Sequence, residues 1–131
     1  MIPKGRILCT EDDPDTRDLL ILMLSAAGYD ATCTKNAEDA LLRVQTESFD
    51  LFLLDNWLPD TSGLELCKQI RLVDPDTPIL FYSGAGYATD KERAVASGAQ
   101  GYLVKPVMPD ELVAEVSRLV EKRYEGSERS A

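Results

Sequence analysis

The chain contains no histidine, so it can carry neither a phosphohistidine nor a histidine general base. It also lacks an excess of basic residues. Its 14 Lys and Arg against 23 Asp and Glu give a net charge of −9, which argues against binding a nucleic-acid backbone. No apolar run approaches the roughly 18 residues that cross a bilayer, and the N-terminus has no signal-peptide pattern. We therefore expect a cytoplasmic protein that binds neither nucleic acid nor membrane.

Cysteine is scarce, and the three cysteines (Cys9, Cys33 and Cys67) form no CxxC pair. Each lies in an apolar stretch. We interpret them as small buried hydrophobic residues of a protein in a reducing compartment.

Apolar, strand-like runs alternate five times with helical patterns along the 131 residues. This alternation is typical of a parallel sheet covered by helices on both faces, so we predict the α/β class and a doubly wound, five-stranded parallel sheet. The expected strands are 6–10, 30–34, 51–55, 79–83 and 101–104. We expect one domain over residues 1–124 and a disordered tail over 125–131, because that tail is polar.

The expected helices have recognisable ends. Asp13 and Asn36 are predicted N-caps of the first two helices, and Thr61 or Ser62 is the predicted N-cap of the third. Gly28 is expected to end the first helix.

Three strand-end signals are expected at one edge of this sheet: Glu11-Asp12, Asp55 and Lys105-Pro106. The carboxyl ends of parallel strands share one edge, where ligands bind. Glu11-Asp12 alone would equally fit a solvated turn. Asp55 favours a site, because it ends the most apolar strand, where an unpaired charge would be costly. Clustered carboxylates favour a hard divalent cation such as Mg²⁺, and a lysine favours an anion, so the edge predicts a phosphoryl site.

Ser83 and Lys105 complete the predicted site. Ser83 ends the fourth strand and is either a turn or cap residue or a phosphate ligand. A cis bond before Pro106 could fix the direction of Lys105. A phosphorylated carboxylate offers three oxygens, which Mg²⁺, the Lys105 ammonium and the Ser83 hydroxyl can bind.

Four blocks of the sequence, in this order and spacing, resemble the receiver domain of two-component response regulators. The blocks are ILCTEDDPDTR at 7–17, LDNWLPDTSG at 54–63, SG at 83–84 and GYLVKP at 101–106. The resemblance covers roughly residues 5 to 124. It implies a flavodoxin-like fold with strand order 2-1-3-4-5.

The resemblance also implies roles for the site residues. Asp55 would be the phosphoacceptor. Asp12 and Asp55 would bind Mg²⁺ (or Mn²⁺) directly, Glu11 would bind it through water, and the backbone carbonyl of Trp57 would complete the set. Glu11 stands where Asp is more usual in the family.

A second group of residues would bind the phosphoryl group and respond to it. Lys105 would bind the phosphate, as would the backbone of Gly84. Ser83 would be the switch hydroxyl and Tyr102 the switch aromatic. Trp57 and Ala85 would tune how long the phosphate lasts.

The function implied is acceptance of a phosphoryl group from a histidine kinase or a histidine phosphotransfer protein. Such a protein is a signalling phosphoacceptor that assists its own phosphorylation and dephosphorylation, and is not otherwise an enzyme. Its signal would pass through the surface of the fourth helix, fifth strand and fifth helix to a downstream protein or a fused output domain. We expect a monomer or a phosphorylation-dependent homodimer. The candidate docking residues, which could equally be ordinary surface and core, are Ala94, Gln100, Tyr102 and Val107.

Three alternatives fit the sequence less well. A haloacid-dehalogenase-like phosphatase would need a second Asp where Trp57 stands. A nucleotide-binding module is suggested by GAGYAT at 84–89, but Thr89 takes the place of the third glycine and the motif follows the fourth strand. A non-phosphorylated pseudo-receiver is disfavoured, because every acceptor, metal and lysine position is filled.

Overall fold

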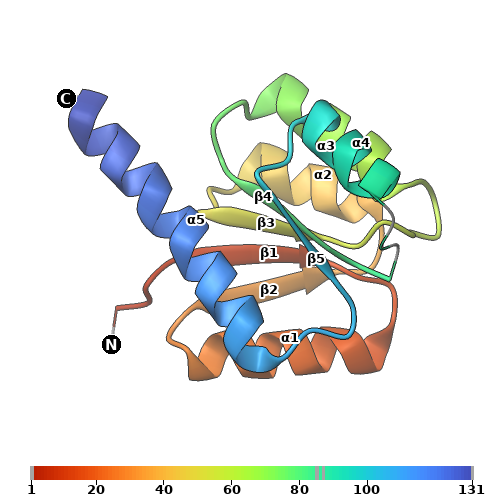
Figure 1. The fold of residues 1–131 in the computed structure, drawn as a ribbon, viewed down its shortest axis with the longest axis horizontal. Helices are drawn as coiled ribbons and strands as arrows, with labels where there is room; N and C mark the ends of the chain where they lie inside the picture. Colours follow the sequence, from red (N-terminus) through yellow and green to blue (C-terminus); the bar gives the residue numbers. More distant parts are fainter. Residues whose placement is uncertain (1, 85, 87, 131) are drawn as a thin grey trace.

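Five parallel strands form one sheet in the order β2-β1-β3-β4-β5 (Figure 1). The computed structural model describes residues 2–84, 86 and 88–130, and for 125–130 it describes the backbone alone. The strands are β1 (Arg6–Thr10), β2 (Asp30–Thr34), β3 (Leu51–Leu54), β4 (Ile79–Ser83) and β5 (Gly101–Val104). The helices are α1 (Pro14–Ala26), α2 (Ala37–Thr46), α3 (Gly63–Val73), α4 (Ala88–Ser97) and α5 (Pro109–Ser130). The predicted fold class and strand order are confirmed.

The sheet separates two apolar cores, as alternation of side chains along each strand requires. In β1, Ile7 and Cys9 face the layer of α1 and α5, whereas Leu8 faces the layer of α2, α3 and α4. In β3 all four residues are buried, two on each side. The prediction of a central β3 is therefore confirmed, and the residue after it, Asp55, is held at a buried strand end.

The predicted helix caps are present. The side chains of Asp13, Asn36 and Ser62 accept hydrogen bonds from the third residue after each, at 2.9, 2.8 and 3.1 Å. Gly28 follows α1 with φ = 95°, a backbone conformation that favours glycine. The strand predicted over 51–55 ends one residue earlier, because Asp55 already belongs to the loop.

The far end of the chain is helical in backbone through Ser130, at the end of α5. The division into a domain over 1–124 and a disordered tail over 125–131 stays a prediction. Among the helices within the described ranges, none combines the length and apolarity that a membrane crossing needs.

Candidate functional site at the carboxyl edge of the sheet

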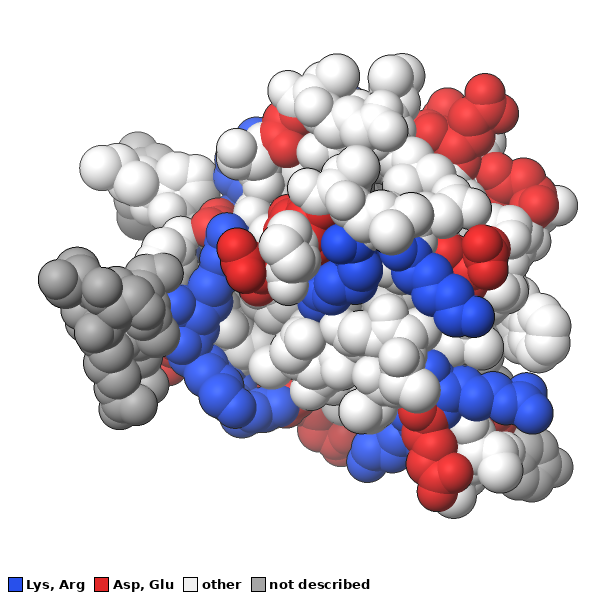
Figure 2. All heavy atoms as spheres, turned by 90° about the horizontal axis from the view of Figure 1, so that it is seen from above, with Lys and Arg blue, Asp and Glu red and all other residues white. Residues whose placement is uncertain are grey.

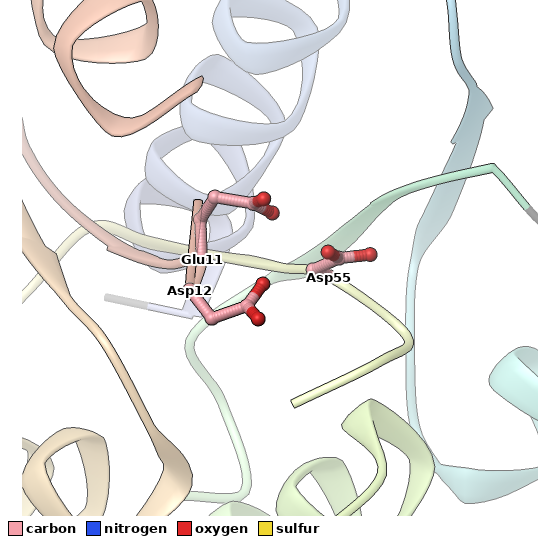
Figure 3. A group of neighbouring side chains, drawn as sticks. All are labelled: Glu11, Asp12 and Asp55. Carbon is pink, nitrogen blue, oxygen red and sulfur yellow. The ribbon is translucent and has the colours of Figure 1, made fainter. Parts of the chain in front are cut away.

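Three carboxylates converge where β1 and β3 end. Glu11 and Asp12 follow β1 and Asp55 follows β3, and Figure 3 shows the first two side chains extending toward the third. One carboxylate oxygen from each lies within 4.8 Å of the others. Glu11 and Asp55 are buried, whereas Asp12 is exposed. The predicted convergence of these two strand ends is therefore confirmed.

Lys105 brings a positive charge to the carboxylates from the end of β5. Its Nζ lies 3.3 Å from Glu11 Oε2 and 3.6 Å from Asp55 Oδ2. The same ammonium lies 4.9 Å from the centre of the Tyr82 ring. The Lys105–Pro106 peptide bond is cis, the form considered from the sequence for this position. One lysine thus pairs with two buried carboxylates.

Burial raises the pKa of Glu11 from 4.5 to about 7. The neighbouring Asp55 adds to this rise, and Lys105 opposes it. Taking a charged carboxylate out of water costs free energy, and a second carboxylate beside it increases the cost. The group therefore gains stability from a proton or from added positive charge.

Backbone hydrogen bonds hold the acidic residues in place. The Asp55 N–H donates to Thr10 O at 3.1 Å and the Glu11 N–H donates to Thr34 O at 3.0 Å, which extends the pairing of the strands. The Asn56 N–H donates to Asp55 Oδ1 at 2.7 Å. This contact directs Oδ1 toward the backbone, whereas Oδ2 faces Lys105.

Arg17 supports the loop from the first turns of α1. Its Nη1 donates to the carbonyls of Glu11 and Asp12, at 3.1 and 2.8 Å. The guanidinium therefore fixes the two backbone units that carry both acidic side chains. Sequence reasoning gave Arg17 no role, because nothing in the spacing shows that its side chain turns back along the chain.

Gly63 lets the loop after β3 fold tightly. A Cβ there would lie 2.2 Å from the Asp55 carbonyl oxygen, and the Gly63 N–H donates to Asn56 O at 2.9 Å. Only a residue without a side chain permits this approach. Trp57, inside the loop, is 70% exposed, and nothing in the structure tests its carbonyl as a metal ligand.

The remaining predicted residues lie at the end of β4 and on β5. Ser83 is buried, and its carbonyl accepts a hydrogen bond from the Lys105 N–H at 2.8 Å. Gly84 is exposed, with open space where a Cβ would stand. Ala85 lies outside the described residues, so its expected effect on phosphate lifetime stays a prediction.

Tyr102 is half-buried against Phe81, with ring centroids 5.8 Å apart. Burial raises the pKa of its phenol, and a side-chain hydrogen bond with Ser83 lowers it. The two predicted switch residues are thus in contact. Ser83 lies on β4 and Tyr102 lies on the neighbouring strand β5.

The predicted docking residues divide between core and surface. Ala94 is fully buried in the core between the sheet and the α2–α3–α4 layer. Val107 packs against the core on the α1–α5 side of the sheet. Gln100 is exposed. The exposed apolar side chains near these elements include Val95, Val104 and Met108.

Comparison with known proteins agrees with this geometry. The family described as the response regulator receiver domain matches residues 7–117. The cell cycle transcriptional regulator CtrA of Caulobacter vibrioides is 34% identical over 125 residues, which are 95% of this chain and 54% of that protein. The transcriptional regulatory protein CssR of Bacillus subtilis is 35% identical over 118 residues, 90% of this chain and 52% of its own length. The chain thus spans about half the length of these relatives.

Solved structures show the same fold. A CheY-like receiver domain protein from Methanospirillum hungatei has a TM-score of 0.88 and 26% identity, covering 92% of this chain and 97% of that one. The chemotaxis protein CheY4 of Vibrio cholerae has a TM-score of 0.84 and 29% identity, covering 88% and 98%.

Proposed function

The chain belongs to the response regulator receiver domain family, and from that premise we propose that Asp55 accepts a phosphoryl group and thereby switches the protein's surface. One observation carries this proposal. Three carboxylates lie within 4.8 Å of one another, and a lysine ammonium contacts two of them. Such a site binds a divalent cation through oxygen and an anion through the lysine.

The donor set fits Mg²⁺ or Mn²⁺, because it is made of carboxylate oxygens and hard cations prefer such ligands. Asp12 and Asp55 would bind the ion directly and Glu11 through a water molecule, with the Trp57 carbonyl as a further ligand. The ion, when bound, supplies positive charge that offsets the carboxylates and the phosphoryl oxygens. The residues hold their positions through the backbone contacts of Arg17 and Asn56.

Asp55 attacks in line. Oδ2 forms a bond to phosphorus while the bond from phosphorus to the donor's histidine nitrogen breaks, and the electron pair of that bond stays on the imidazole. Lys105 and Ser83 bind two phosphoryl oxygens, and the Gly84 N–H supports them. Positioning and charge stabilisation account for the rate of such transfers. Attack by water on the acyl phosphate later restores Asp55.

The switch follows from the contact of Ser83 with Tyr102. When the Ser83 hydroxyl binds a phosphoryl oxygen, it shifts toward Asp55. Tyr102, stacked on Phe81, then occupies a different position beside β4. This change shifts the balance between two arrangements of the α4–β5–α5 face.

The partners follow from this chemistry. The donor is a histidine kinase or a histidine phosphotransfer protein in the cytoplasm, and the output passes to a downstream protein or a fused output domain. We propose that the protein is a monomer or a phosphorylation-dependent homodimer. Binding to nucleic acid is disfavoured by the net charge of −9, and Figure 2 shows acidic and basic side chains interspersed on one face.

A phosphatase of the haloacid dehalogenase type is not supported. Its second aspartate would be needed at position 57, where an exposed tryptophan stands. We propose that the chain is a phosphoacceptor that assists its own phosphorylation and dephosphorylation, rather than an enzyme acting on other molecules.

Intact-mass analysis after incubation with Mg²⁺ and acetyl phosphate tests the proposal. The wild type gains one phosphoryl group, and the Asp55→Asn variant gains none. Asp76→Asn, in an exposed turn before β4, is the matched control and labels like the wild type. Equal labelling of the wild type and Asp55→Asn contradicts the assignment of the phosphoacceptor.

A further inference from the structure

Cys9 and Cys33 lie side by side on neighbouring strands, although 24 residues separate them in the chain. They are direct partners in the parallel register of β1 and β2. Partnered residues on adjacent strands point to the same face of the sheet. Cys9 is part of the core between the sheet and the α1–α5 layer, and Cys33 packs against that core.

The spacing of the strands suits a covalent bond between the two sulfurs. Neighbouring strands lie about 4.8 Å apart, within the range of about 4.4–6.8 Å between the Cα atoms of a disulfide. Both thiols are free in this structure. Cys33 Sγ also lies 3.9 Å from the Arg17 carbonyl oxygen, on the side of the sheet that α1 covers.

Exposure distinguishes the two thiols. Cys33 is only half-buried, so solvent reaches part of it, whereas Cys9 on the neighbouring strand is fully buried. A hydrogen bond with Cys9 lowers the pKa of the Cys33 thiol, although burial opposes this. Cys67, on the opposite side of the sheet, donates its S–H to Ser97 O at 3.4 Å.

We propose that Cys9 and Cys33 form a reversible disulfide when the protein meets a hydroperoxide. This site is separate from the phosphoacceptor and does not depend on phosphorylation of Asp55. The bond would join β1 and β2 just before Glu11 and Thr34, whose backbones pair at the edge of the acidic site.

The reaction has two steps. The Cys33 sulfur attacks the peroxide, a sulfur–oxygen bond forms as the oxygen–oxygen bond breaks, and the departing hydroxide takes the thiol proton to become water. The Cys9 sulfur then attacks the oxidised Cys33 sulfur. A sulfur–sulfur bond forms, and the second hydroxide leaves with the Cys9 proton as water. Two thiols are oxidised and one hydrogen peroxide is reduced to two waters.

Differential alkylation of the full chain tests the proposal. The protein is treated with hydrogen peroxide while folded, then denatured and alkylated with iodoacetamide. We expect the wild type to fall from three alkylated thiols to one, with a mass lower by two hydrogens before alkylation, and to recover all three after dithiothreitol. Trypsin cuts after Arg6, Arg17 and Lys35, so the expected product is peptide 7–17 linked to peptide 18–35.

Two variants serve as controls. Cys67→Ala should lose both of its remaining thiols, as the wild type loses its pair. Cys33→Ser should keep two alkylatable thiols, and a melting curve like that of the wild type shows that it is folded. The proposal is overturned if the wild type keeps three thiols, if Cys33 becomes a sulfinic acid while Cys9 still alkylates, or if the linked peptides come only from covalent dimers.

Discussion

Glu11 shows most clearly how burial and neighbouring charges act on the residues of this site. It is buried beside Asp55, and Lys105 offsets its charge. Its folded pKa of about 7 exceeds the value of 4.5 that we take for the unfolded chain. Between these values the folded form holds more protons than the unfolded form, so stability falls as pH rises through that window and the full cost is present above it.

We therefore predict that the metal-free wild type melts at a higher temperature at pH 5.5 than at pH 8. Glu11→Gln removes the titrating group, so this variant should show a smaller difference between the two pH values. Thermal unfolding in EDTA, followed by circular dichroism, measures both. If the melting temperature of the wild type rises between pH 5.5 and pH 8, the inference that burial disfavours the charged form of Glu11 is contradicted.

Arg17 donates hydrogen bonds to the backbone that carries Glu11 and Asp12, so we expect it to orient two residues of the proposed metal site. Removing a group that orients metal ligands commonly weakens metal binding by about 10–100-fold. We predict that Arg17→Gln binds Mg²⁺ about tenfold more weakly than the wild type, as measured by quenching of the exposed Trp57. Arg43→Gln, which removes a surface pair with Glu47, is the matched control and should bind Mg²⁺ normally. Equal affinities for Arg17→Gln and the control would remove Arg17 from the account.

At the scale of helices and strands, Asp60 connects the loop after β3 to the start of α2. The sequence alone gives no sign of this contact. Its two carboxylate oxygens accept hydrogen bonds from the N–H groups of Ala37 and Glu38, each at 3.0 Å. The loop after β3 is thereby attached to the N-terminus of α2. These contacts also lower the pKa of Asp60.

Asp60→Ala should lower the free energy of unfolding by about 1 kcal/mol, the usual cost of losing a helix N-cap. Asp76→Ala removes an exposed carboxylate elsewhere and should change it by less than about 0.5 kcal/mol. Urea denaturation measures both values. If the two variants unfold alike, the contacts of Asp60 with α2 do not contribute to stability.

The sequence predicts the elements well, because hydrophobic period and helix caps are local signals. These signals predicted the five strands and the caps at Asp13, Asn36 and Ser62. The convergence of the carboxylates was predicted because the carboxyl ends of parallel strands share one edge of the sheet. The contacts of Arg17 and Asp60 were not, because they depend on how loops fold in space. The close approach at Gly63 was missed for the same reason.

At the scale of the whole molecule, the site opposes the stability of the metal-free fold. Two buried carboxylates, Glu11 and Asp55, share the Lys105 ammonium among the described contacts, and the exposed carboxylate of Asp12 lies beside them. A ligand that binds only the folded state stabilises it by mass action, by about 2.7 kcal/mol at 100 times its Kd. We therefore expect metal binding at this site to be coupled to the folding of the whole protein.

Asp55→Ala should melt higher than the wild type in EDTA, because it relieves repulsion. Saturating Mg²⁺ should raise the melting temperature of the wild type by several degrees and that of Asp55→Ala much less. Asp76→Ala should follow the wild type in both conditions. An Asp55→Ala variant that melts lower in EDTA, or a wild type that ignores Mg²⁺, would contradict the coupling.

Chemical trapping of the phosphorylated residue tests the central claim most directly. Sodium borohydride reduces an aspartyl phosphate to homoserine, so the protein labelled with acetyl phosphate and Mg²⁺ is reduced, digested and sequenced by mass spectrometry. The account predicts homoserine at position 55 and aspartate retained at position 12. Homoserine at position 12 or elsewhere, with Asp55 unchanged, would contradict it.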